Sequence, residues 1–327
     1  MSYRMSAHFG SLRTTMALLA LLAVVVMATP SFTPLTVALG LLAINLVAAL
    51  FVHPLLRRQL PLLVFHLALL ALLVLVGVGR TASLDGRFEL TQGVPFDGRL
   101  LDKDSGPLYD APLQRLAFTQ YGFEIDYAPG RQRGATRNSV SWRVADSAPR
   151  SAVTGDHRPL VIDGHRIYTS PNKGFAPLLR WLPTRGEAVL GAVHLPSFPV
   201  HELRQSREWT LPDGREAWVM LQFDQTLIDP AKTSSFRLPD EHRLIVRIGE
   251  LRATLTPGER MTIDSGTLVY EGLRTWMGYR VAYDPTLPWL LAASLLAALA
   301  LAWHYARKFF TVPAPAQPRT AAEVAHG

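Results

Sequence analysis

The residue with the clearest chemical potential is a histidine inside an apolar stretch. His66 lies within the block 60–78, which carries no charged residue. A histidine inside a membrane helix needs a partner that offsets its desolvation, and such residues commonly ligate haem or a metal ion or relay protons. The alternative is an interhelical hydrogen bond, which stabilises packing by only about 1 kcal/mol. From the residues alone, both interpretations of His66 stay open.

Two more histidines lie at the ends of other apolar blocks. His53 follows the second block and His304 lies near the end of the last one. Polar and aromatic side chains commonly anchor helix ends at a membrane interface, so a ligand role is only a secondary hypothesis for both. Five further histidines lack the i, i+4 or His-x-His spacing of a metal site, which favours surface or structural roles: His157, His165, His194, His201 and His242.

Other chemistry has little support in the sequence. The chain has no cysteine, so it cannot exchange electrons through thiols. Neither a GxGxxG nor a P-loop pattern is present, which argues against nucleotide-driven chemistry. Asn45, the one amide of the second apolar block, is expected to make a helix-packing hydrogen bond. We therefore predict no metal site and no catalytic residue.

Four apolar blocks must position these histidines, and they predict transmembrane helices at 12–28, 35–52, 60–78 and 287–305. The first block resembles a signal peptide, with basic residues ahead of it and small residues behind. The second block then enters the membrane again, so the pair is interpreted as a retained helical hairpin. The predicted fold class is a membrane protein with four transmembrane helices and one large domain.

Charge predicts the orientation of these helices. The net charge is +7, and residues 80–284 are nearly balanced. The excess lies beside the apolar blocks, at Arg4, Arg13, Arg57, Arg58, Arg307, Lys308 and Arg319. By the positive-inside rule both termini belong in the cytoplasm and the domain between the third and fourth helices lies outside. A groove for nucleic acid would instead concentrate basic residues within that domain, so nucleic acid is excluded as a partner.

The segment 80–285 predicts a mainly antiparallel β domain, sandwich-like or barrel-like. Runs rich in β-branched and aromatic residues mark the strands, at 116–127, 139–144, 160–168, 217–223, 243–248, 267–270 and 279–283. Turn signals separate them, at 128–130, 163–164, 212–214 and 257–258. The stretch 174–182 is predicted as a short helix or a loop. After the last helix (286–306), a cytoplasmic tail covers 307–327, and its part 313–318 is expected to be a disordered extension.

Several stretches, in this order, resemble the ResB family, also called CcsB, of system II cytochrome c biogenesis. They are Phe9-Gly-Ser-Leu-Arg13, Leu42-Ala-Ile-Asn-Leu46 with Arg57-Arg58, Phe65-His66-Leu67, Glu89-Leu-Thr-Gln-Gly93, Asp163-Gly-His-Arg-Ile-Tyr168 and Gly278-Tyr-Arg-Val-Ala-Tyr-Asp-Pro285. The resemblance covers most of the chain. The first helix and its connector are short for the family and the outer domain is compact.

The resemblance implies a subunit of a cytochrome c maturation complex in the inner membrane. Such a subunit pairs with a CcsA or ResC type membrane protein, exports haem and presents it to apocytochrome c. It implies a non-catalytic or co-catalytic part of a holocytochrome c synthase, with haem as the bound cofactor. His66 matches the membrane histidine of the family and is the expected axial ligand, with His53 and His304 as lesser candidates. The large domain is then periplasmic.

A function of another class fits the same pattern of helices and strands. The chain could be a membrane-anchored sensor or assembly scaffold, whose outer β domain binds a ligand or a protein while His66 only packs. Haem discriminates these hypotheses, because only the maturation subunit is expected to copurify with it.

Overall fold

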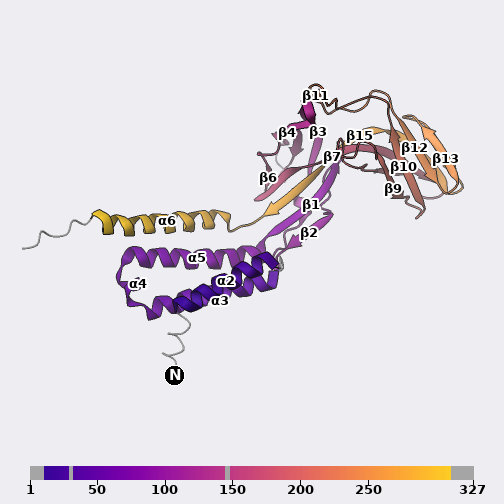
Figure 1. Ribbon diagram of the computed structural model, residues 1–327. Coiled ribbons are helices and arrows are strands. Elements are labelled where there is room, and N and C mark those ends of the chain that lie inside the picture. The colour runs from indigo at the N-terminus through magenta and orange to yellow at the C-terminus, as the bar shows by residue number, and fades with distance from the viewer. Residues whose placement is uncertain (1–10, 29–31, 144–147, 311–327) are drawn as a thin grey trace, which may run out of the picture. The chain divides into compact units, whose positions relative to one another are not determined.

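The structure is a computed structural model that describes residues 11–28, 32–143 and 148–310. Its backbone forms two compact units (Figure 1). The helical unit comprises Met1–Ala82, Gly106–Leu108 and Asp284–Gly327, and the β unit comprises Ser83–Ser105 and Tyr109–Tyr283. The extension predicted at 313–318 lies outside the described residues.

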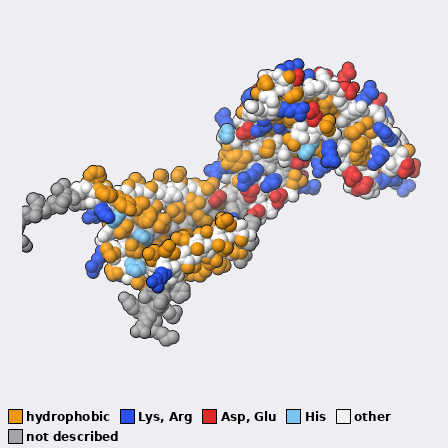
Figure 2. Space-filling model, in the orientation of Figure 1, with side chains coloured by type: hydrophobic (Ala, Val, Ile, Leu, Met, Phe, Trp, Pro, Cys, Tyr) orange, Lys and Arg blue, Asp and Glu red, His pale blue; other side chains and the backbone are white. Residues whose placement is uncertain are grey.

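Long apolar helices make up most of the helical unit. They are α2 (Leu12–Ala28), α3 (Phe32–Val52), α5 (Leu60–Ala82) and α6 (Leu287–Phe310), and a short helix α4 (Pro54–Arg58) joins α3 to α5. In Figure 2, hydrophobic side chains cover much of the visible surface of these helices. Helix α5 packs against both α3 and α6, and α2 packs against α3. These contacts place α5, which carries His66, beside both α3 and α6.

Three of the four predicted spans have the length and composition to cross a membrane. These are α5, α6 and the part Pro34–Val52 of α3. Helix α2 has 17 residues. At 1.5 Å per residue it extends about 26 Å, less than the roughly 30 Å of a hydrocarbon core. The structure therefore supports membrane association, and a full span by α2 stays a prediction.

The third span ends later than the sequence predicts. The apolar block predicts a helix that ends at Val78, but α5 continues to Ala82. A Cβ atom added to Gly79 would lie 2.7 Å from Oγ1 of Thr286, just ahead of α6. Because glycine has no Cβ, it permits this close approach. Gly79 therefore permits close contact between α5 and the residue ahead of α6, and it does not end the helix.

The β unit contains three antiparallel sheets, which confirms a mainly antiparallel β domain. The largest has the strand order β2-β1-β15-β7-β6, with β14 beside β15 and β8 beside β7. Its strands are β1 (Leu84–Thr91), β2 (Asp102–Ser105), β6 (Leu160–Ile162), β7 (His165–Pro183), β8 (Val189–Ala192), β14 (Arg260–Ile263) and β15 (Gly266–Tyr283).

Two four-stranded sheets complete this unit. One has the order β13-β12-β10-β9 and the other β11-β3-β4-β5. Their strands are β3 (Phe118–Ala128), β4 (Gln132–Trp142), β5 (Arg150–Thr154), β9 (Ser206–Thr210), β10 (Glu216–Gln222), β11 (Ser234–Ser235), β12 (Arg243–Ile248) and β13 (Leu251–Leu255). Buried side chains from all three sheets form one hydrophobic core.

The stretch 174–182 corrects one expectation, because it is neither a helix nor a loop. It lies inside β7 and pairs with β15, with Gly174 opposite Trp276. The segment from Lys173 to Leu179 is buried at every position. Such a run has no two-residue alternation, so its pattern does not separate a buried strand from a helix. Pairing with β15, which is distant in the sequence, makes this stretch a strand.

The predicted strands 267–270 and 279–283 also differ from the structure, because both belong to β15. A register shift falls between Tyr270 and Gly272, and another between Met277 and Tyr279. Such bulges let a strand bend while its pairing continues. The turn at 163–164 follows its prediction: Asp163 (φ 47°) and Gly164 (φ 77°) join β6 to β7, as a two-residue hairpin requires.

Candidate functional site

A cavity of about 490 Å³ lies within the helical unit. Its apolar lining comprises Leu12, Leu19, Leu42, Leu46, Ala49, Leu56, Leu69, Leu72, Leu73 and Val76. Four polar residues complete it: Thr15, Asn45, His53 and His66. This size falls in the range of small-molecule sites, which are mostly apolar with a few placed polar groups.

His66 lines this cavity from the second turn of α5. Its Nδ1 lies 2.7 Å from the carbonyl oxygen of Leu62, one turn earlier in the helix. The ring of Phe65 meets the imidazole edge-on, with centroids 5.2 Å apart. Among the described residues, Nε2 of His66 has no hydrogen-bond partner. When Nδ1 donates its proton to the carbonyl, Nε2 keeps the lone pair that a metal ion needs.

His53 lines the same cavity from the junction between α3 and α4. Its backbone N–H donates to the carbonyl of Ala49, and its extended φ of −100° precedes Pro54. Proline disfavours a helical conformation in the preceding residue, so the chain turns at His53. Two histidines that are thirteen positions apart in the sequence thereby share one cavity.

Asn45 and Thr15 join α2 to α3 beside the cavity. The Thr15 hydroxyl donates to Oδ1 of Asn45 over 2.8 Å, and Asn45 is buried. This contact confirms the expected helix-packing hydrogen bond of Asn45. Sequence reasoning missed its donor, although a threonine in an apolar block was a visible signal.

His304 does not join His53 and His66. It lines a different cavity, together with the basic residues Arg58, Arg307 and Lys308. The three histidines singled out in the sequence are thus divided between two places in the helical unit. Only the first offers an apolar enclosure for a hydrophobic ligand.

The described part of the chain gathers few metal-ligating side chains in one place. No group of three or more histidine, aspartate or glutamate side chains is placed to hold a metal ion there. A lone imidazole suits a metal that brings its own ligand set, as haem iron does with four porphyrin nitrogens. The cavity therefore offers a ligand two imidazole rings and apolar walls.

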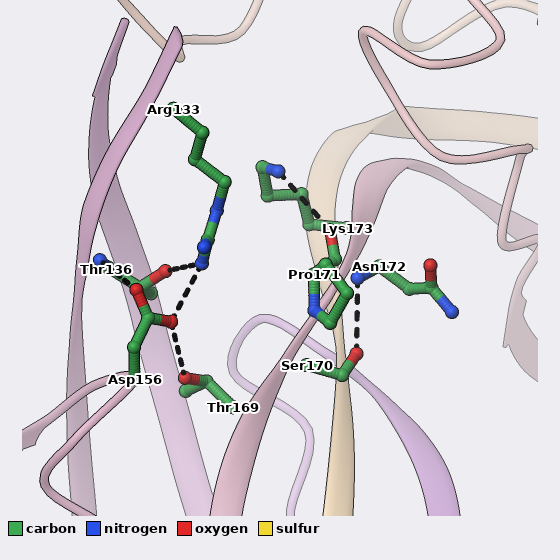
Figure 3. Close-up of polar contacts among 8 residues, drawn as sticks. All are labelled: Arg133, Thr136, Asp156, Thr169, Ser170, Pro171, Asn172 and Lys173. Carbon is green, nitrogen blue, oxygen red and sulfur yellow. Dashed lines mark hydrogen bonds and ion pairs between the residues drawn. The ribbon is translucent and has the colours of Figure 1, made fainter.

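Polar groups in the β unit form a cluster of another kind (Figure 3). Nη2 of Arg133 donates to Oδ1 of Asp156 over 2.7 Å and also to the hydroxyl of Thr136. Asp156 accepts further hydrogen bonds from the backbone of Thr136 and the hydroxyl of Thr169. Burial opposes ionisation of Asp156, but these hydrogen bonds prevail and lower its pKa. Three residues of the β unit thus hold the Asp156 carboxylate in place.

Lys173 is the third charged group of that region and is 3% exposed. Its Nζ donates to the carbonyl of Pro171 over 3.3 Å and lies 5.7 Å from the ring centre of Tyr127. Burial, with a smaller contribution from the nearby Arg133, lowers the pKa of Lys173 from 10.5 to about 8. No sequence pattern marked this lysine, because β7 was not recognised there.

Two histidines of the β unit, His194 and His165, use both ring nitrogens within the protein. Nδ1 of His194 lies 2.8 Å from Oε2 of Glu89, and its Nε2 lies 2.7 Å from the hydroxyl of Thr91. The imidazole also stacks on Trp276. His165 contacts the hydroxyl of Tyr109 and the carbonyl of Asp163 in a similar way. These contacts suit the structural roles expected for both residues.

Comparison with known proteins adds little to this geometry. No family model and no curated protein matches the chain. A solved structure titled "Cytochrome c Heme Lyase CcmF" aligns over 90% of this chain and 34% of that one, with 12% identity and a TM-score of 0.27. The alignment therefore spans about a third of that protein's length. A TM-score this low does not establish a shared fold.

Proposed function

We propose that the chain is the haem-holding membrane subunit of a cytochrome c maturation machine. In this proposal it works with a CcsA or ResC type partner and presents haem to apocytochrome c. All four long helices cross the membrane, both termini are cytoplasmic and the β unit is periplasmic. The basic flanks and the ResB-like stretches support that arrangement.

One observation carries the proposal, namely the setting of His66. Haem is a large apolar cargo whose iron needs an axial ligand, and crossing a bilayer requires a lined path. The cavity supplies apolar walls, and the Leu62 carbonyl contacts one ring nitrogen of His66 and leaves the other for iron. A histidine that only packed between helices would instead hydrogen-bond another helix.

In this proposal the residues that line the cavity have different roles in binding haem. His66 would hold the haem iron, and the leucines would exclude water from the bound group. His53 lies where the cavity reaches the end of α3, and its imidazole would suit a haem carboxylate or the iron. The partner subunit or His53 would supply a further ligand to the iron, and no covalent chemistry is assigned to this chain.

Copurified haem tests the proposal. The full chain, coexpressed with its partner, is expected to show a Soret band, and His66→Ala is expected to lower haem occupancy and holocytochrome yield at least tenfold at unchanged protein level. Added imidazole should enter the vacated space and restore part of both. His304→Ala is the matched control, because it removes a membrane-region histidine outside this cavity.

Two results would contradict the proposal. In the first, the His66→Ala variant matures cytochrome c at the native rate when haem is scarce. In the second, the wild-type complex carries no haem at all. The second result would favour a membrane-anchored sensor or scaffold, in which His66 only packs.

A further inference from the structure

Two buried side chains of the β unit keep hydrogen-bond donors that the protein does not use. Lys173 on β7 is 3% exposed and Tyr127 on β3 is 2% exposed. Nζ of Lys173 makes one hydrogen bond, over 3.3 Å to the carbonyl of Pro171, so two of its three N–H donors are left. The hydroxyl of Tyr127 has no partner in the part of the chain that the structure describes. Buried polar groups are satisfied as a rule, so these donors indicate a bound group.

The two side chains meet a third group of donors at Arg133. Tyr127 and Arg133 lie directly opposite each other on β3 and β4, so their side chains share one face of that sheet. Nζ of Lys173 lies 5.7 Å from the ring centre of Tyr127, and the charge of Arg133 acts on both residues. Figure 3 shows Arg133 and Lys173 on separate strands, and β7 belongs to a different sheet from β4. Donors from three strands therefore converge on one region.

The lack of a matching acceptor indicates what kind of group binds there. The carboxylate of Asp156 already accepts hydrogen bonds from three residues. In the described part of the chain Arg133 bonds through Nη2 alone, which leaves its Nε and Nη1 as further donors. A water molecule would bring two more donors to a region that needs acceptors. A halide ion, which only accepts, matches the donors of Lys173, Tyr127 and Arg133 better.

Charge favours the same class of ligand. The charged groups that act on Lys173 are Arg133 and Asp156, so the region holds two cations and one anion when the lysine is protonated. The excess positive charge lies on a buried side chain, where an unpaired charge costs free energy. The side chain of Arg133 is 29% exposed, so a small ion can reach these donors from that side.

We propose that Lys173, Tyr127 and Arg133 bind a small monovalent anion of the halide class, such as chloride. Lys173 supplies the compensating charge, Tyr127 donates its O–H, and Arg133 donates an N–H while Nη2 stays paired with Asp156. The ion joins β7 to the sheet of β3 and β4, and the site does not depend on haem binding in the helical unit. The pKa of about 8 for Lys173 reflects the protein's own groups and applies to chloride-free buffer, because a bound anion raises it.

A chloride titration of the full-length protein in detergent tests this site. Gluconate replaces chloride at pH 7 so that the ionic strength stays constant. Because only the folded β unit forms the site, a dissociation constant of about 10 mM would raise the ratio of folded to unfolded protein about tenfold at roughly 100 mM chloride. Urea unfolding followed by tryptophan fluorescence measures this ratio. Broadening of the chloride NMR signal by the folded protein, reversed by added bromide, measures binding directly.

Matched variants assign the effect to individual side chains. Lys173→Met is expected to lose the chloride dependence, and Tyr127→Phe, which removes only the hydroxyl, should raise the dissociation constant about tenfold. Lys232→Met removes an exposed lysine that pairs with Asp229 and should bind chloride like wild type.

Three outcomes would overturn the proposal. In the first, the wild-type protein neither gains stability from chloride nor broadens its NMR signal, so that water satisfies the donors. In the second, Lys173→Met keeps the chloride dependence of wild type, which places the ion elsewhere. In the third, Tyr127→Phe broadens the chloride signal as much as wild type does. This last comparison decides the matter even where Lys173→Met does not fold.

Discussion

His66 in the helical unit and His194 in the β unit differ in how far the protein occupies their imidazoles. His194 has Glu89 on one nitrogen, Thr91 on the other and Trp276 against its face. His66 has a backbone carbonyl on one nitrogen and an apolar cavity beside it. A histidine with both nitrogens paired stabilises the fold, whereas one with a nitrogen left over can serve a ligand. Burial alone does not separate the two roles.

The largest expected effect on stability comes from the fully paired histidine. His194→Ala leaves the Glu89 carboxylate and the Thr91 hydroxyl without their partner and removes the stacking on Trp276. We expect the free energy of unfolding of the β unit to fall by about 3 kcal/mol. Urea unfolding of the full-length protein, followed by tryptophan fluorescence, measures this change.

The same experiment tests the contrast between the two histidines. The exposed His157 provides a control, and His157→Ala should change the unfolding free energy by less than about 0.5 kcal/mol. Haem occupancy should stay at its wild-type level in His194→Ala. If haem were lost instead, the assignment of ligand binding to the helical unit alone would fail.

A smaller effect, of opposite sign, is expected at Lys173. Because the pKa of Lys173 is about 8 in the folded protein and 10.5 is its ordinary value, the unfolded chain binds more protons between these two pH values. The β unit should therefore become more stable as pH rises from 8 to 10.5. Below pH 8 the cost of burying the charge, about 3 kcal/mol for this shift, is present in full. Lys173→Met also removes the contacts of Nζ with Pro171 and Tyr127, so it should stabilise the protein there by about 2 kcal/mol.

Unfolding midpoints between pH 7 and pH 10.5 measure this dependence. Lys173→Met is expected to abolish most of the rise with pH, whereas the exposed Lys232→Met should keep it. An unchanged slope in Lys173→Met would show that other groups cause the dependence. A destabilised variant at pH 7 would show that contact with Tyr127 outweighs the cost of burial.

The smallest effect concerns the polar pair beside the cavity. Thr15→Val removes the donor to Asn45 and should destabilise the packing of α2 on α3 by about 1 kcal/mol. Unfolding of the reconstituted protein by sodium dodecyl sulfate measures it. Thr15→Ser keeps the hydroxyl and should behave like wild type. Equal loss in both variants would assign the effect to the methyl group rather than to the hydrogen bond.

Local sequence determined the elements whose signals need no distant partner. Apolar blocks of about 20 residues predict membrane helices because each residue adds a fixed rise, and α3, α5 and α6 follow that rule. Strand β12 has the predicted bounds Arg243–Ile248. The hairpin turn at Asp163-Gly164 was also predictable, because two consecutive positive φ angles favour these residue types.

Tertiary structure alone decided the groups that meet across long stretches of chain. Glu89 and His194 are separated by 105 positions, and no local pattern connects them. The length of β7 depends on β15, which begins more than 80 residues after β7 ends. Likewise, His66 was visible as an isolated polar residue. Only packing of α2 on α3 and of α3 on α5 formed a cavity beside it and brought in His53. The sequence shows which polar side chains need hydrogen-bonding partners, and tertiary packing determines which residues become those partners.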